Sequence, residues 1–400
     1  MSLGVLFLNW HLLPEFQALT ASLPSGPLQG VVVVEIGSNI SGPATTALLA
    51  AQGALVIKVE RPGGDPSRQY LSSSEFGTLN VGKKSYIAES PGDYAELLRL
   101  ADVIVDNRSQ GAKDRDSVLQ SVLLSTDKVR PLIFCSITGY PGVEKDRVAL
   151  DQSVQAETGM AAANADIQGN PQRVGFVALD LTTPLRAAFD IAATLFSIQK
   201  GIPVPEPERL VRIEVSMAQV ASYLLFGHYH QALEGRLSSK TKNKRAWVAP
   251  FSFYSAKDGL LAIGITQDDQ FKRFSEFVLE RPELGLLYPK NQKRITEIES
   301  LEKSLNEILI TRDRREWVER CRIHRIPCSS VNSLPEAVKQ PFVQEFMVQT
   351  PQGTRILDTR SFSSLFPKDA LPHFPALGEG HQEVQACLRA IQGTSSVTVK

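Results

Sequence analysis

The stretch GVVVVEIGSNISGPATTALLAAQGALVIKVE, residues 30–60, decides the fold of this chain. Residues 30–37 form a continuous β-branched run, which is typical of a strand buried on both faces. Pro43 suits the first turn of a helix, and Gly53 suits its end. A second buried strand follows over 54–60. Strand, helix and strand in this order predict a βαβ unit and therefore a parallel sheet.

The same alternation continues toward residue 200. It predicts a helix over 91–100, a strand over 101–107, a helix that includes 121–127, and a strand over 132–140. A helix is expected over 184–200, opened by its proline. One apolar face of that helix would consist of Leu185, Ala188, Phe189, Ala192, Leu195 and Phe196. These elements predict a Rossmann-like α/β domain.

The composition changes near residue 238, where the polar and basic segment 238–245 has the character of a linker. Residues 250–265 read as two strands joined by a Lys-Asp-Gly turn, and charged helices follow, which indicates a smaller α+β domain. The expected organisation is an N-terminal extension over 1–26, a Rossmann-like domain over 27–237, a linker and small α+β domain over 238–345, and a C-terminal segment over 346–400 that returns to the large domain.

Overall charge and hydropathy exclude several classes of partner. Lys plus Arg equals Asp plus Glu at 43 each, so no global field attracts nucleic acid or anionic membrane. No apolar run reaches the ~18 residues of a membrane span. The apolar opening lacks the basic start and cleavage site of a signal peptide. A cytoplasmic location with no membrane or nucleic-acid partner is therefore expected.

Four cysteines are too few and too unevenly spaced for a disulfide framework, and they fit a reducing compartment. His324 lies between Cys321 and Cys328, but the spacing is not that of a zinc site. We expect buried thiols and no metal.

The generic motifs of nucleotide and hydrolase chemistry are missing. After the first strand the chain reads GSNISGP (37–43) instead of G-x-G-x-x-G, so the glycines that admit a pyrophosphate are absent. Neither a Walker A sequence nor a G-x-S-x-G elbow occurs. No histidine lies between His11 and His228. Acid–base or nucleophilic work in the α/β domain must therefore fall to carboxylates.

Nine segments in order resemble those of the family III CoA-transferases, which include formyl-CoA transferase, carnitine CoA-transferase and α-methylacyl-CoA racemase. Together they cover about residues 27–390. The segments are GPLQGVVVVEIGSNISGPATTALLAAQGALVIKVERPGGDPSR (26–68), FGTLNVGKKS (76–85), ADVIVDNRSQGA (101–112), ITGYPG (137–142), DRVALDQSVQAETG (146–159), VGFVALDLTTPLRAA (174–188), VAPFSFYSAKDGLLAIGI (248–265), RIPCSSVNSL (325–334) and PALGEGHQEV (375–384).

The resemblance implies a two-domain subunit in an interlocked homodimer, in which each subunit forms a ring threaded by the other. The large domain, 27–237, would bind CoA and carry the catalytic residue. An acyl-CoA and a carboxylic acid acceptor would be the substrates. No tightly bound cofactor is implied, because CoA enters and leaves as part of the substrate.

Asp180 matches the family's nucleophile through its place in Ala-Leu-Asp-Leu-Thr-Thr. It precedes the expected helix start at Pro184, so it would lie at the positive end of the helix, which favours an ionised carboxylate by ~0.3–1 kcal/mol. From the local sequence alone, a capping role is the more common one. A carboxylate suits CoA transfer, because its attack on a thioester gives an anhydride that keeps the acyl group activated.

The phosphates of CoA require basic residues gathered in one place. The resemblance assigns CoA binding to Arg61, Asn107, Arg108, Arg115, Ser41 and Asp151. Arg115 is the strongest of the cations, because its spacing from Asn107 agrees with the family pattern. For any single arginine, a solvated surface role is the alternative. For Asp151, orientation of substrate or a lid and a structural hydrogen bond stay equally open.

Two alternatives to transfer remain. The racemase branch of the family has a histidine immediately before the counterpart of Asp151, where this chain has Leu150, which cannot move protons. This substitution disfavours an α-methylacyl-CoA racemase-like isomerase. Departures from the family pattern at Arg209-Leu210 and Met217-Ala218 leave open a catalytically silent CoA-binding homologue. Retention of Asp180 argues against that alternative.

Overall fold

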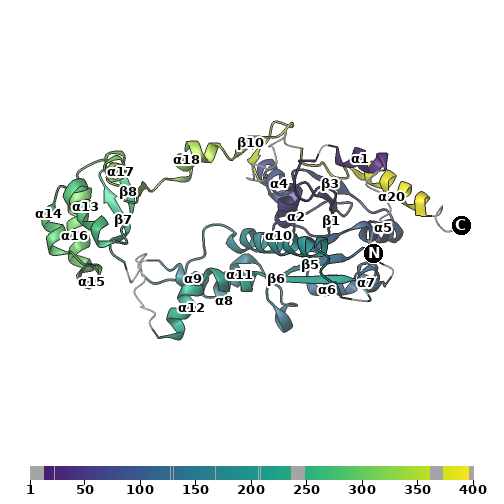
Figure 1. Ribbon diagram of the computed structural model, residues 1–400, viewed down its shortest axis with the longest axis horizontal. Coiled ribbons are helices and arrows are strands. Elements are labelled where there is room, and N and C mark those ends of the chain that lie inside the picture. Colours follow the sequence, from purple (N-terminus) through teal and green to yellow (C-terminus); the bar gives the residue numbers. More distant parts are fainter. Residues whose placement is uncertain are drawn as a thin grey trace. The chain divides into compact units, whose positions relative to one another are not determined.

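The computed structural model describes residues 13–21, 23–126, 128, 130–166, 168–205, 207, 209–235, 248–360 and 373–395 (Figure 1). The predicted linker segment 238–245 and residues 1–12 lie outside these ranges. The chain divides into two compact units. The first unit comprises Met1–Met160, Arg173–Phe226 and Glu345–Lys400, and the second comprises Ala161–Gln172 and Gly227–Gln344.

Among the residues that the structure describes, a parallel six-stranded sheet forms the centre of the first unit. This confirms the parallel sheet that the sequence predicts. Its strand order is β3-β2-β1-β4-β5-β6. The strands β2 and β3 are added on one side of β1, and β4, β5 and β6 on the other, so the strand order reverses between β1 and β4. The strands are β1 (Val32–Glu35), β2 (Leu55–Val59), β3 (Lys83–Tyr86), β4 (Val103–Asp106), β5 (Leu132–Thr138) and β6 (Leu210–Ser216). In such sheets ligands bind at the carboxyl ends of the strands, where the order reverses.

Helices cover both faces of the sheet, and alternate residues of one strand enter different cores. Val33 packs in one cluster with residues of α2 (Ser41–Ala50) and α10 (Ala178–Gln199). Val32 and Val34 pack in another cluster, with residues of α1 (Pro14–Thr20), α5 (Pro91–Leu100), α7 (Ser117–Leu124) and α20 (His381–Ser395). Helices α1 and α20, from opposite ends of the chain, lie side by side (Figure 1).

Shorter elements complete the first unit. They are α3 (Ser67–Tyr70), α4 (Ser73–Asn80), α6 (Gln110–Arg115), the 3-10 helix η2 (Gly142–Glu144), α8 (Asp151–Glu157), α11 (Met217–Leu224) and the hairpin of β10 (Met347–Gln349) with β11 (Arg355–Leu357). Two further helices, α9 (Met160–Ala163) and α12 (Phe226–Leu233), begin at the last residue of a first-unit segment and continue into the second unit.

The second unit contains an antiparallel sheet of β7 (Phe251–Ala256), β8 (Gly259–Gly264) and β9 (Cys328–Ser330). The two predicted strands over 250–265 are thus confirmed, and they are joined at Lys257-Asp258. Its helices are α13 (Asp268–Arg273), the π-helix η3 (Phe274–Val278), α14 (Pro282–Leu287), α15 (Asn291–Thr296), α16 (Ile298–Leu309), α17 (Arg314–Ile323), α18 (Leu334–Ala337) and α19 (Pro341–Gln344). Residues of α13, η3, α14, α16 and α17 form one apolar core with residues of β7 and β8, and this core includes Trp317.

The prediction that Pro184 opens its helix is wrong. Helix α10 begins at Ala178, so Pro184 lies inside it. The proline has no N–H to donate to the carbonyl of Asp180, one turn earlier, and a proline this close to a helix start is tolerated more easily than one at the centre. Asp180 therefore belongs to the first turn of α10 instead of preceding the helix.

No helix among the described residues has both the length and the apolar character needed to cross a membrane.

Candidate active site

Asp180 lies at the carboxyl edge of the parallel sheet. Helix α10 connects β5 to β6, and these two strands pair in parallel. A helix that connects parallel neighbours runs back along the sheet, so its first turn stands at the carboxyl ends of the strands. Within the described residues, no side chain donates a hydrogen bond to the Asp180 carboxylate, which is half-buried. The site thus offers a carboxylate that is poorly solvated and unengaged.

Asp151 caps the helix that carries Asp180. Its Oδ2 accepts the backbone N–H of Leu179 at 2.6 Å and that of Asp180 at 3.2 Å. These donors are two of the first N–H groups of α10, which have no partner inside the helix. Asp151 is itself buried, and Gln155 donates from its side-chain amide to Oδ1 of Asp151. Gln155 also accepts the backbone N–H of Val174 at 2.8 Å, which fixes the chain just before α10.

The electrostatics of this corner oppose ionisation of Asp180. Burial, with the neighbouring charge of Asp151, raises the pKa of Asp180 from 3.8 to about 6. The sequence suggested the opposite direction, because a helix N-terminus favours a carboxylate. In the structure the first N–H groups already serve Asp151, and its negative charge lies beside them. Asp180 is still mostly ionised at neutral pH, and its raised pKa makes it a better nucleophile than an ordinary aspartate.

Asn107 joins the loops that follow β4 and β1. Its Oδ1 accepts the backbone N–H of Ser38 at 2.9 Å, and its Nδ2 donates to Ser38 O at 2.9 Å and to Ser41 Oγ at 3.0 Å. Glycine is required beside it, because a Cβ on Gly37 would lie 2.3 Å from Asn107 Oδ1 and one on Gly42 2.8 Å. These contacts lie at the point where the strand order reverses, so Asn107 and Ser41 hold the loop of the expected ligand site.

The three predicted arginines differ in how they are engaged. Arg108 forms a bidentate ion pair with the fully buried Asp106, with its Nη2 at 2.7 Å from Oδ2, and also reaches Asp116 at 3.1 Å. This arrangement gives Arg108 a structural partner. Arg61, two residues after the end of β2, and Arg115, the last residue of α6, are exposed and form no ion pair with a described residue. They are therefore the better candidates for phosphate contacts.

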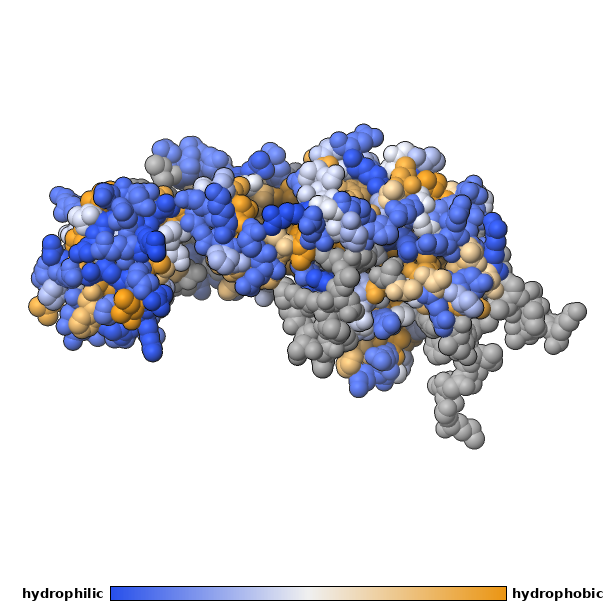
Figure 2. Space-filling view, turned by 90° about the horizontal axis from the view of Figure 1, so that it is seen from above, coloured by the Kyte–Doolittle hydropathy of each residue, from blue (hydrophilic) through white to orange (hydrophobic). Residues whose placement is uncertain are grey.

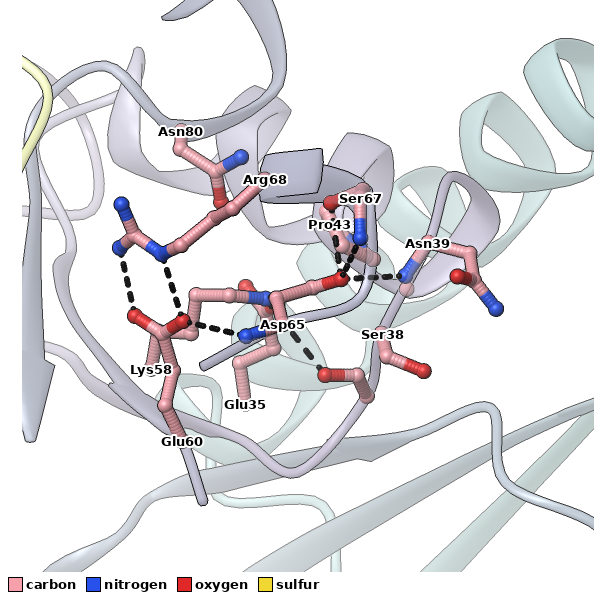
Figure 3. Close-up of polar contacts among 12 residues, drawn as sticks. Glu35, Ser38, Asn39, Pro43, Lys58, Glu60, Asp65, Ser67, Arg68 and Asn80 are labelled. Carbon is pink, nitrogen blue, oxygen red and sulfur yellow. Dashed lines mark hydrogen bonds and ion pairs between the residues drawn. The ribbon is translucent and has the colours of Figure 1, made fainter. Parts of the chain in front are cut away.

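Four buried charged side chains form a network beneath the loop that follows β1 (Figure 3): Glu35, Lys58, Asp65 and Lys83. Lys58 is 2.5 Å from Glu35 and 2.7 Å from Asp65, and Lys83 is 2.8 Å from Glu35. Thr46 also donates to Glu35, at 2.5 Å. Burial opposes ionisation of Glu35, yet both lysines lower its pKa. Burial lowers the pKa of Lys83 to about 8.

Sequence reasoning missed this network. No strand was predicted over 83–86, but Lys83 begins β3 and its side chain is buried, at 2% exposed. Lys58 interrupts the apolar run of β2, and Glu35 ends that of β1. A charge at the end of an otherwise apolar buried strand is the feature that could have indicated an internal ion pair.

The sequence profile of CoA-transferase family III matches residues 28–381. The chain belongs to this family. It is therefore an enzyme, a CoA-transferase, and it acts in acyl-CoA metabolism. This match confirms the resemblance to the family that the nine segments indicated.

Named relatives of this CoA-transferase span most of its length. It is 26% identical to the succinate–glutarate CoA-transferase of Agrobacterium fabrum, over 92% of this chain and 98% of that protein. It is 30% identical to the succinyl-CoA:glutarate CoA-transferase of Mus musculus, over 78% and 74%. A crystal structure of a CAIB/BAIF family protein from Brucella suis shares the fold, with a TM-score of 0.76 and 24% identity, over 91% of this chain and 100% of that one.

Proposed function

We propose that this protein is an acyl-CoA:carboxylate CoA-transferase that works through a thioester between Asp180 and CoA. The observation that carries the proposal is the state of the Asp180 carboxylate. It is half-buried at the carboxyl edge of the sheet, receives no hydrogen bond from a described side chain, and has its pKa raised to about 6 by burial and Asp151. A nucleophile needs these properties: it is ionised at neutral pH yet weakly solvated.

The reaction would proceed in four displacements. A carboxylate oxygen of Asp180 attacks the thioester carbonyl of the donor, and CoA leaves as a thiolate. The thiolate then attacks the Asp180 carbonyl of the mixed anhydride, which releases the donor acid and leaves an aspartyl-CoA thioester. An acceptor carboxylate attacks that thioester and expels the thiolate again. The thiolate attacks the acyl carbon of the second anhydride, which frees Asp180 and gives the new acyl-CoA.

CoA would bind across the point where the strand order reverses. Arg115 and Arg61 would contact phosphate, since both are exposed and unpaired within the described residues. Asn107 and Ser41 would shape the loop against which the CoA part of the substrate lies. Arg108, which is paired with Asp106 and Asp116, would act mainly by holding the end of β4 in place. Asp151 would act indirectly, by capping the helix α10 that carries Asp180. No tightly bound cofactor is proposed, because CoA enters and leaves as part of the substrate.

We propose that the acids exchanged are small dicarboxylates. The Agrobacterium fabrum and Mus musculus relatives are named for succinate or succinyl-CoA and glutarate. A relative from Acetobacter aceti, 28% identical over 80% of this chain and 85% of that protein, is named for acetyl-CoA and oxalate. Each of these names contains at least one dicarboxylate. Succinyl-CoA with glutarate is therefore the first pair to test.

A second copy of the chain would cover part of α10. Leu181, Leu185, Phe189 and Phe196 are all exposed on this helix. Their spacing places them along one side of it, which forms an apolar stripe. On the face shown in Figure 2, hydrophilic residues predominate and apolar residues form smaller patches among them. An apolar stripe of this length is typical of an interface, and the interlocked homodimer implied by the family would supply the partner.

Intact mass spectrometry after incubation with acyl-CoA tests the covalent step. Succinyl-CoA, acetyl-CoA and formyl-CoA would each be mixed with the protein, with Asp180→Ala and with Asp190→Asn, which removes a half-buried carboxylate, paired with Arg186, further along α10. A CoA-sized adduct that maps to Asp180 and is missing only from Asp180→Ala is expected. An adduct on another residue, or equal adduct in Asp180→Ala, would refute the mechanism. Deuterium exchange beside the thioester without transfer would favour the racemase-like alternative.

A further inference from the structure

Two cysteines of the second unit come from neighbouring elements. Cys321 lies in the last turn of α17, and Cys328 is the first residue of β9. His324, which lies between them in the sequence, has its ring stacked on that of Phe277, with the ring centroids 5.2 Å apart. The two thiols therefore form a pair without this histidine, and the proposed transfer mechanism does not use them.

The turn after α17 brings the chain back toward Cys321. Ile326 donates its backbone N–H to Cys321 O at 2.8 Å, and Arg325 donates to Arg322 O at 3.2 Å. Arg325 has a φ of +57°. These two bonds around a left-handed residue are the features of a Schellman motif, which reverses the chain at the end of a helix. As a result β9, which begins at Cys328, packs against α17.

The register of β9 directs the Cys328 side chain to the core that contains Cys321. Cys328 pairs with Ile263 of β8 in the antiparallel sheet. Residues directly opposite each other in an antiparallel pair have their side chains on the same face of the sheet. Ile263 and Cys321 are buried in one apolar core, and Cys328 packs against it. The two thiols meet there and are hydrogen-bonded to each other.

The two thiols differ in their access to solvent. Cys321 is 1% exposed, whereas Cys328 is only partly buried. Cys328 also lines a cavity of about 860 Å³, together with Arg322, Pro327 and Ser329. A small reagent that enters this cavity therefore meets Cys328, while Cys321 is enclosed in the core.

The hydrogen bond also makes the two thiols chemically unequal. The bond with Cys321 lowers the pKa of Cys328, against the opposing effect of burial. The same bond, together with burial, raises the pKa of Cys321. Cys328 is thus the thiol that ionises first, with the Cys321 S–H as a donor to its thiolate. Thiolates are the forms that peroxides oxidise, and an accessible one beside a second thiol suits reversible oxidation.

We propose that Cys328 and Cys321 form a reversible oxidation site for hydrogen peroxide, in which Cys328 reacts first and Cys321 closes a disulfide. The Cys328 thiolate attacks one peroxide oxygen and the O–O bond breaks, which gives a sulfenic acid and hydroxide. The Cys321 sulfur then attacks the Cys328 sulfur, the S–O bond breaks, and a second hydroxide leaves. Each hydroxide takes up the proton of one thiol, so two thiols and one hydrogen peroxide give one disulfide and two waters. Asp180 takes no part, so the site does not depend on the proposed transferase function.

Thiol counting on the full chain tests the site. The protein is treated with a small molar excess of hydrogen peroxide and unfolded in acid, and its remaining thiols are alkylated for peptide mapping. Loss of two of the four thiols is expected, with a disulfide between Cys321 and Cys328 of the same chain. Dithiothreitol should restore both. Retention of all four thiols, a disulfide between chains, or a sulfinic acid on Cys328 beside a free Cys321 would overturn the proposal.

Three variants assign the role of each thiol. Cys321→Ala should accumulate a sulfenic acid on Cys328 that dimedone traps, because the second thiol is missing. Cys328→Ala should keep all its thiols, because the buried Cys321 is not reached. Cys135→Ala, which removes a fully buried thiol of the first unit, is the matched control and should form the disulfide as the parent does. Thiol loss in Cys328→Ala, or no dimedone adduct in Cys321→Ala, would contradict these roles, and peptide mapping of the parent decides the pairing even where a variant is unstable.

Discussion

The carboxylate of Asp151 lies at the backbone of Asp180, where its Oδ2 accepts the Asp180 N–H at 3.2 Å and the Leu179 N–H at 2.6 Å. One carboxylate thus caps the helix that carries the other. The cap stabilises the first turn of α10 and at the same time holds a negative charge near a second one. Ionisation of Asp180, the proposed nucleophile, is therefore opposed by the charge of the residue that caps its helix.

Neutralising Asp151 should shift the pH dependence of transfer. Asp151→Asn keeps an oxygen that can accept the Leu179 N–H but removes the charge that helps to raise the pKa of Asp180. Since Asp180 must be ionised to attack, the acid limb of kcat, expected near pH 6, should move down by about half a unit to one unit. A pH–rate profile measures this. An acid limb that does not move, or moves equally in Asp190→Asn, would contradict it.

Removing the proposed nucleophile, Asp180, should stabilise the fold at neutral pH. The folded-state pKa of Asp180 is raised, so ionising it costs stability above about pH 6, and this cost vanishes below about pH 4, where the unfolded chain is protonated too. Asp180→Asn lacks the charge and should gain about 1 to 2 kcal/mol at pH 8. Thermal unfolding at pH 8 and pH 5 measures it. The gain should shrink as the pH falls; a gain that grows would show the sign to be wrong.

Neutralising Glu35, the acid that pairs with both lysines of the buried network, should destabilise the fold. Glu35→Gln leaves Lys58 and Lys83 facing a neutral group in a site without water access, which should cost about 3 to 5 kcal/mol. The matched control is Glu383→Gln, which breaks the ion pair of an exposed carboxylate with Lys84 and should cost less than about 1 kcal/mol. Urea unfolding compares them. Equal costs would mean that the network contributes no more than a surface pair.

Arg115 and Arg108 should respond in different assays. Arg115→Ala should weaken CoA binding about 10-fold or more, with little change in stability, because the exposed guanidinium has no ion pair with a described residue. Arg108→Ala should cost about 2 to 4 kcal/mol of stability, because it leaves the buried Asp106 without its bidentate partner. Calorimetric titration with CoA and urea unfolding separate the two. Loss of CoA affinity in Arg108→Ala alone would reverse these roles.

Much of the fold could be predicted because it depends on local pattern. Apolar β-branched runs correspond to β1 and β2, and helix α5 occupies the expected residues 91–100. Strand β3 was missed because its two lysines, Lys83 and Lys84, resemble a surface segment in sequence. Of the candidate site, Asp180 was found by its motif, but the function of Asp151 as the cap of α10 required the three-dimensional structure. The two residues are 29 positions apart, and nothing local joins them.

The sequence by itself determined the parallel sheet, the strands β1, β2, β4 and β5, the family and the candidate nucleophile, because periodicity and motifs are properties of contiguous residues. Only the tertiary structure decided which charges are partners. It paired Arg108 with Asp106, enclosed Lys58 between Glu35 and Asp65, and left Arg115 exposed. The physical reason is that ionic and hydrogen-bonding partners meet where the ends of separate strands converge, so the neighbours that set their pKa values and burial lie far away in sequence.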